Sequence, residues 1–187
     1  MRYVVGFLIG IGLIVLTFIL IFKAFSGGGN DAPKTQAVDL NSYANTNAIV
    51  RYTIDGPLES NSEHHRVRIT VARDQVSIEQ IEGYQGKLVL SKSYPNNPDS
   101  YANFLHALTI AGYEKVDKNK PTDERGYCPL GRRYIYEAID GGDTVLRSWS
   151  TSCGSLGNFS GGKADTIRSL FMRQVPDYNT LDNNFDV

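Results

Sequence analysis

The two cysteines of the chain, Cys128 and Cys153, are the residues best suited to covalent chemistry. Two thiols in one small domain can pair as a disulfide, which persists in an oxidising compartment. A hairpin predicted over residues 132–151 brings the cysteines almost level, and Pro129 and Gly131 can absorb the remaining offset through a bend or bulge. We therefore expect a structural disulfide, which contributes roughly 3 kcal/mol in the chain-entropy model.

Cys153 also has an alternative interpretation as a nucleophile. A cysteine enzyme needs a histidine to take the thiol proton and a donor for the developing oxyanion. The candidate bases are His64, His65 and His106, and the candidate donors are Arg147 and Arg168. The segment WSTSC, which ends at Cys153, resembles sortase-like transpeptidases in Thr151 and the cysteine, with Ser152 inserted between them. The resemblance implies a surface cysteine hydrolase or transpeptidase, anchored like that family by an N-terminal helix.

The sequence lacks the residue patterns of metal, serine-hydrolase and phosphate-binding sites. His64 and His65 are adjacent, so their rings would point to opposite faces of a strand, and no CxxC or HxxxH spacing supports a metal. The glycines of residues 154–162 fit neither the serine-hydrolase elbow nor a phosphate-binding loop. We expect no cofactor and no metal, and our first interpretation is that the protein is not an enzyme.

Aromatic and arginine side chains are dense around the two cysteines. They are Tyr127, Arg132, Arg133, Tyr134, Tyr136, Arg147, Trp149 and Phe159. Such residues dominate binding hot spots because each joins a large contact area to a polar group. One interpretation makes the hairpin aromatics part of the core. The other predicts a binding surface made of Tyr127, Arg133, Tyr136 and Arg147.

The N-terminal segment has the pattern of a membrane helix. From Tyr3 to Phe22 the only polar side-chain groups are those of Tyr3 and Thr17, and the run spans roughly 30 Å as a helix. A secretory signal peptide is the main rival, but its apolar region is usually shorter. We predict a lipid-bilayer anchor within residues 1–25, and Gly6 and Gly10 can support weak homodimer contact between two such helices.

The charges flanking this segment are nearly balanced, so the cysteines decide the orientation. A disulfide places the domain outside and the N-terminus in the cytoplasm. Residues 26–37 are small and polar and are expected to be a flexible linker. The chain carries 19 basic and 20 acidic side chains, which disfavours nucleic acid as a partner and leaves an envelope or protein ligand.

Hydrophobic spacing predicts one α+β domain over residues 38–176. Strands are expected at residues 48–55, 66–72, 76–81 and 87–93 as an antiparallel meander, because apolar and polar residues alternate. Asn97 and Pro98 begin a predicted helix that ends at Gly112, and a second is expected at residues 163–174. Both helices should pack on one face of the sheet. Residues 113–126 are predicted to be an exposed loop and residues 177–187 a disordered tail.

The C-terminal hairpin carries a specific register prediction. If Gly141 and Gly142 form a two-residue turn between strands 132–140 and 143–151, the facing residues are determined. The predicted pairs are Tyr134 with Trp149, Tyr136 with Arg147, and Ala138 with Val145. The chain is thus expected to be a membrane-anchored, extracytoplasmic binding module with a disulfide-framed hairpin. A pilin-like subunit is disfavoured because the apolar run has no glutamate near its start.

Overall fold

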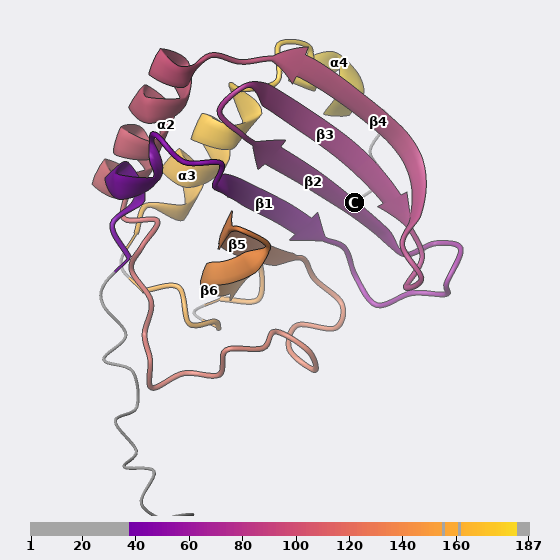
Figure 1. The fold of residues 1–187 in the computed structure, drawn as a ribbon. Coiled ribbons are helices and arrows are strands. Elements are labelled where there is room, and N and C mark those ends of the chain that lie inside the picture. Colours follow the sequence, from indigo (N-terminus) through magenta and orange to yellow (C-terminus); the bar gives the residue numbers. More distant parts are fainter. Residues whose placement is uncertain (1–37, 155, 161, 183–187) are drawn as a thin grey trace, which may run out of the picture. The chain divides into compact units, whose positions relative to one another are not determined.

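The computed structural model describes residues 38–154, 156–160 and 162–182. Their centre is a six-stranded antiparallel sheet with strand order β4-β3-β2-β1-β5-β6 (Figure 1). The strands are β1 (Ile49–Asp55), β2 (His65–Val71), β3 (Gln75–Glu82), β4 (Lys87–Pro95), β5 (Arg133–Asp140) and β6 (Asp143–Thr151). The first four form the predicted meander, and the C-terminal hairpin adds β5 and β6 beside β1.

Alternation along the strands gives the sheet two different faces. On β2, Val67, Ile69 and Val71 are buried on one face, as predicted from their spacing. Their neighbours Arg66 and Arg68 face the other side, because successive side chains of a strand point in opposite directions. One face of the sheet is therefore apolar along its centre and the other carries charged side chains.

The helix α2 (Pro98–Ala111) confirms its predicted limits and covers the apolar face. Asn97 caps it by accepting a hydrogen bond from the backbone N–H of Ser100 at 2.9 Å. The helix buries an apolar stripe with spacing i, i+3, i+4 and i+7, and its members are Tyr101, Phe104, Leu105 and Leu108. Gly112 ends the helix in the left-handed conformation, with φ of 80°, which a residue without a Cβ adopts at little cost.

The C-terminal part of the domain is more ordered than expected. The helix α3 (Ala164–Met172) buries Ile167 and Phe171 in the same core as α2. A further short helix, α4 (Tyr178–Asp182), forms where a disordered tail was expected. Tyr178 and Leu181 are buried, so the apolar residues of this segment complete the core instead of remaining in solvent. A short 3-10 helix, η1 (Leu40–Tyr43), packs beside α2 before β1.

The predicted register of the hairpin is wrong by one residue. The turn at Gly141–Gly142 is correct, but a bulge between Ala138 and Ile139 shifts the pairing beyond it. The observed partners include Ile135 with Trp149, Tyr136 with Ser148, Glu137 with Arg147, and Ala138 with Leu146. A shift of one residue transfers a side chain to the other face, so Trp149 lies on the face opposite the helices.

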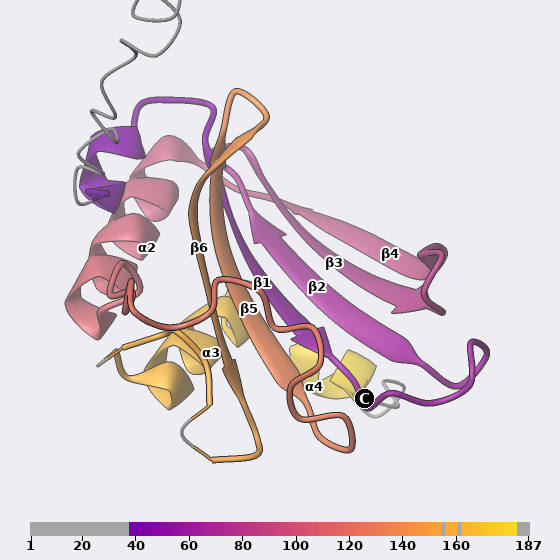
Figure 2. The same ribbon diagram turned by 90° about the horizontal axis from the view of Figure 1, so that it is seen from below.

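The long connection between α2 and β5 is not simply exposed. It runs from the helix layer around the β6 edge and over the opposite face, as Figure 2 shows. Val116 forms an isolated bridge with Phe159, and the backbone N–H of Asp117 donates to the Asn158 oxygen at 2.7 Å. The connection buries Trp149 to 1% exposure, although that side chain is not in the helix-side core.

None of the helices in the described part of the chain is long and apolar enough to cross a membrane. The predicted membrane helix and most of the predicted linker lie outside the described residues.

Candidate functional site

Three arginines lie together on the sheet face opposite the helices. Arg51 belongs to the central strand β1, and Arg66 and Arg68 belong to its neighbour β2. In the β1–β2 register, Thr53 lies opposite Arg68 and Asp55 lies opposite Arg66. Arg51 is therefore diagonal to Arg68, a distance that long side chains readily span. We call Arg51, Arg66 and Arg68 the arginine face.

The carboxylates near the arginine face do not use all of its donors. Glu137 Oε2 lies 3.6 Å from Arg51 Nη1, and Glu79 Oε2 lies 3.5 Å from Arg68 Nη1. Both contacts are ion pairs too long for good hydrogen bonds. The Nε atoms of all three arginines are buried without a hydrogen-bond partner among the described residues.

Burial and charges of both signs act on the pKa of the Arg68 guanidinium. Desolvation lowers this pKa, and repulsion from Arg51 and Arg66 lowers it further. Glu79 and Glu137 act in the opposite direction and raise it. An arginine remains charged despite such a shift, so the three positive groups repel one another and would be relieved by an incoming anion. The side chains of Arg51 and Arg68 are 25% and 30% exposed, which leaves them accessible.

The four residues predicted as a binding surface do not form one. Tyr136 is 1% exposed and packs in the helix-side core against Tyr52, with ring centroids 5.5 Å apart. Arg133 is 3% exposed on the opposite face. Both are therefore interior residues, because the strand period separates neighbours 133 and 136 onto different faces.

The other two predicted residues, Tyr127 and Arg147, hold the connection against the sheet. Tyr127 contacts Trp149 with ring centroids 5.1 Å apart. Arg147 donates from Nη1 to the Thr122 oxygen at 2.8 Å and from Nη2 to Glu124 Oε2 at 2.6 Å. The guanidinium donors of Arg147, which were expected to bind a ligand, are thus largely engaged within the protein.

A buried charged cluster joins the ends of β1, β2 and β5. Arg133 Nη2 lies 2.9 Å from Asp55 Oδ2 and also donates to the Gly56 oxygen at 2.7 Å. His64 Nε2 lies 3.1 Å from Asp55 Oδ1. Burial raises the pKa of the Asp55 carboxyl, although the neighbouring Arg133 and, to a smaller extent, His64 oppose that rise. The cluster fixes the strand ends relative to one another.

His64, one of the candidate bases, lies directly before β2 and is 2% exposed. Its ring stacks on Tyr84 with centroids 4.3 Å apart, and its Nδ1 lies 2.9 Å from the Pro57 oxygen. These partners come from separate connections of the sheet, so no local pattern in the sequence could indicate the burial. The arginines 66 and 68, by contrast, were visible in the alternation of β2 as residues of its polar face.

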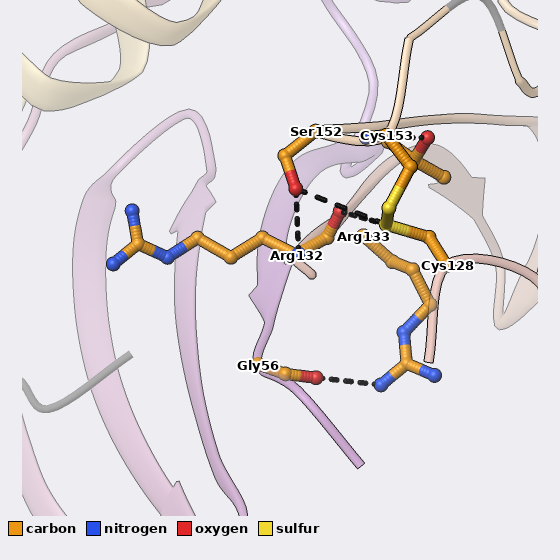
Figure 3. Close-up of a disulfide and its surroundings, with 7 residues drawn as sticks. Gly56, Cys128, Arg132, Arg133, Ser152 and Cys153 are labelled. Atoms are coloured by element: carbon orange, nitrogen blue, oxygen red, sulfur yellow. Dashed lines mark hydrogen bonds between the residues drawn. A yellow bond between two sulfur atoms is a disulfide. The ribbon is translucent and has the colours of Figure 1, made fainter. Parts of the chain in front are cut away.

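The predicted disulfide joins Cys128 and Cys153, whose Cα atoms are 5.7 Å apart (Figure 3). A turn reverses the chain here, since the N–H of Gly131 donates to the Cys128 oxygen at 3.2 Å. A Cβ on Gly131 would lie 2.5 Å from Cys128 Sγ and 2.6 Å from Ser152 Oγ, so only glycine fits. With its sulfur bonded to Cys128, Cys153 is not a thiolate and has no nucleophile to offer.

No group of three or more histidine, cysteine or acidic side chains in the described ranges is arranged to hold a metal ion.

The chain matches no protein-family model, and no curated protein matches it significantly. Among solved structures it resembles "Crystal structures of trypanosoma bruciei MRP1/MRP2" with a TM-score of 0.23 and 14% sequence identity. That similarity covers 69% of this chain and 84% of the other. A TM-score of this size carries no argument about the fold or function of this chain.

Proposed function

We propose that this chain is a single-pass membrane protein whose domain lies outside the cytoplasm and binds an anionic ligand on the arginine face. The membrane anchor rests on the apolar run from Tyr3 to Phe22. The outside location rests on the disulfide, because such bonds are rare in the cytosol. The ligand class follows from the unengaged arginine donors.

The observation that carries the ligand class is the incomplete use of Arg51 and Arg68. Each guanidinium has five N–H donors, and among the described residues neither makes a hydrogen bond to its neighbouring carboxylate. A guanidinium fork matches a carboxylate or phosphate through two parallel hydrogen bonds. Both arginines are carried by adjacent central strands, so their positions are set by the sheet ladder and not by a flexible loop.

The α2–β5 connection leaves Arg51 and Arg68 of the arginine face accessible. Residues 113–132 cover the β6 side of this sheet face through Trp149 and Arg147. Arg51 and Arg68 keep about a quarter or more of their side-chain surface exposed. A ligand can therefore reach these arginines without displacing the connection.

Retention on envelope material tests the proposal. The full chain in detergent is applied to lipid-extracted envelope of its host, and Arg51→Gln and Arg68→Gln are compared with wild type. Each substitution keeps a polar side chain but removes the charged fork, and we expect roughly tenfold weaker retention. Arg68→Lys should not restore it, because lysine lacks the planar fork.

Arg173→Gln is the matched control, since Arg173 is exposed at the end of α3 on the other side of the sheet. It should retain wild-type binding. Equal retention by wild type and both face variants, with all proteins folded, contradicts the proposal. If the face variants do lose retention, competition by inorganic phosphate or by acetate distinguishes phosphate-bearing from carboxylate-bearing ligands.

A further inference from the structure

Exposed apolar side chains gather at one end of the sheet. Among the described residues, seven large apolar side chains are exposed. Six of them belong to connections or strand ends that meet where β1, β3 and β6 end and β2, β4 and β5 begin: Leu58, Tyr84, Leu88, Val89, Leu130 and Leu156. The seventh, Ile110, lies on α2 in the helix layer. We call this end of the sheet, with its connections 56–64, 83–86 and 127–132 and the segment that follows β6, the loop end.

Individual exposed apolar residues are ordinary, but those of the loop end are also held in place. The backbone N–H of Leu58 donates to the Pro129 oxygen at 2.7 Å, which ties the first connection to the disulfide turn. The Tyr84 hydroxyl donates to the Glu59 oxygen at 2.8 Å, and its ring stacks on the buried His64. Leu130 remains 87% exposed although the disulfide of Cys128 fixes its turn.

This rigidity favours binding, because a flexible loop loses conformational entropy when it becomes ordered on a partner. A surface that is already fixed in the free protein avoids that cost, and large apolar groups near its centre then supply affinity. Hydrogen bonds and a ring stack fasten the three connections to one another, and the disulfide fastens the third to the segment after β6. Their apolar side chains nevertheless stay in solvent. Figure 1 shows the β1–β2 and β3–β4 connections together at the right of the sheet, with α2 at the left.

A hollow with a volume of about 630 Å³ lies beside these apolar residues. It is lined by Gly56, Pro57, Glu59, Ser60, Ser62, Glu63 and His65. In the described part of the chain, the carboxylate of Glu59 has no partner, and that of Glu63 accepts only from Ser60 Oγ at 2.7 Å. The hollow thus presents two carboxylates without a cation of the protein itself.

The charges of Glu59 and Glu63 decide which kind of partner this surface can bind. An anionic lipid surface would be repelled by Glu59 and Glu63. A two-fold dimer would bring the Glu59 and Glu63 carboxylates of both copies into one interface, where their mutual repulsion opposes association. A protein that presents a basic side chain beside an apolar one satisfies both the carboxylates and the exposed leucines.

We propose that the loop end is a docking surface for a different protein, which places a lysine or arginine in the hollow and apolar side chains against Leu58, Tyr84 and Leu130. The proposal does not rest on Arg51 or Arg68, which lie on the middle of the sheet and have the opposite charge preference. Only Arg66 of the arginine face reaches the loop end, where it donates to the Gly83 oxygen at 3.1 Å. Variants of Arg51 or Arg68 should leave this docking unchanged.

Site-specific photocrosslinking in the intact membrane tests the proposal. The photoreactive residue p-benzoyl-L-phenylalanine replaces Leu130 in the full chain, and a second version carries it at Leu58 in case the first disturbs the disulfide turn. Ile110 is the matched control position, because it is an equally apolar side chain with 73% exposure away from the loop end. We expect a light-dependent adduct with another protein from positions 130 and 58 but not from 110.

The charge requirement is tested in the same experiment. The double substitution Glu59→Gln and Glu63→Gln should lower adduct yield roughly fivefold to tenfold, as expected for two lost charge-assisted contacts. Asp143→Asn, at the exposed first residue of β6 at the other end of the sheet, should not change it. Mass spectrometry of the adduct should place the crosslink within reach of a lysine or arginine of the partner.

Several outcomes would overturn the proposal. These are no adduct from either loop-end position, an equal yield from position 110, an adduct with lipid or with a second copy of the chain, and a yield insensitive to Glu59 and Glu63. A cooperative urea unfolding transition of each purified variant shows that the variant has folded, and alkylation before and after reduction shows that its disulfide is kept.

Discussion

Trp149 Nε1 donates a hydrogen bond to the backbone oxygen of Pro121 at 2.8 Å, which fastens the α2–β5 connection to the sheet face opposite the helices. The indole is fully buried there, between the strand and a segment that lacks regular secondary structure. The protein therefore has apolar packing on both faces of its C-terminal hairpin, with the helices on one side and this connection on the other.

Truncation of this indole should be strongly destabilising. We expect Trp149→Ala to lower the free energy of unfolding by about 3 to 5 kcal/mol, because it removes a buried side chain and leaves a cavity. Trp149→Phe keeps an aromatic ring but loses the donor to Pro121, and should cost about 1 to 2 kcal/mol. Urea unfolding followed by circular dichroism measures both, since Trp149 is the only tryptophan and cannot report on its own absence. Ile110→Ala, on an exposed helix surface, should change stability by less than about 0.5 kcal/mol.

The disulfide makes a separate prediction about thiol reactivity. Alkylation of the unreduced protein should label neither Cys128 nor Cys153, because their sulfurs are bonded. Replacing both with alanine should lower stability by roughly 2 to 5 kcal/mol, the usual cost of a lost disulfide in a small secreted domain. Two freely labelled thiols would remove both the bond and the main argument for an outside domain.

Arg147 should contribute to stability, in contrast to its expected role as a ligand donor. Arg147→Ala removes hydrogen bonds to Thr122 and Glu124, and the charged contact is partly screened at about one-third exposure. We expect a loss of about 1 to 2 kcal/mol and faster tryptic cleavage after Lys118 and Arg125 in the loosened connection. Arg173→Ala is the control for removing a surface arginine. A variant with wild-type stability and cleavage rate would show that the two contacts contribute little.

The contact between Tyr94 and Asp177 predicts a pH dependence. Hydrogen bonds from Lys92 and then from Tyr94 lower the pKa of the Asp177 carboxyl. Its stabilising contribution is therefore present above the unfolded pKa of about 4 and is lost as pH falls through the lower folded value. Burial and the Asp177 contact raise the pKa of Tyr94 to about 12, so its contribution is present below about 10 and is lost as pH rises through about 12.

Asp177→Asn should accordingly unfold at a lower urea concentration than wild type at pH 6, and the two midpoints should converge near pH 2. Because the carboxyl is exposed, the difference at pH 6 will be small. A gap that persists unchanged in acid would show that the asparagine acts through packing of α4 and not through the lost charge.

Membrane topology can be tested with an epitope placed after Val187. Protease added to intact cells or spheroplasts should digest the domain and leave the N-terminal segment in the membrane. Full protection of the epitope would place the domain inside. Release of the epitope into the medium without protease would favour a cleaved signal peptide.

Local patterns in the sequence were sufficient wherever a single element decides its own structure. The alternation of β2 predicted which face is buried, because side chains of a strand alternate irrespective of its partners. Asn97, Pro98 and Gly112 predicted both ends of α2, because each acts on the backbone of its own helix. The pairing of Cys128 with Cys153 followed from the hairpin turn, which brings the chain back on itself within a short distance.

The tertiary structure decided what depends on pairing between distant segments. One bulged residue in the hairpin moved Trp149 to the other face, and a bulge is set by sheet twist and packing, not by composition. His64 and Arg133 became buried because Asp55 lies between them, and their separation in the chain left no local signal. The sequence by itself thus determined which side chains of β2 are apolar, where α2 begins and ends, and that Cys128 can pair with Cys153. The fold decided which charges are buried with partners and which arginine donors remain open, because those depend on contacts that form only when the strands are assembled.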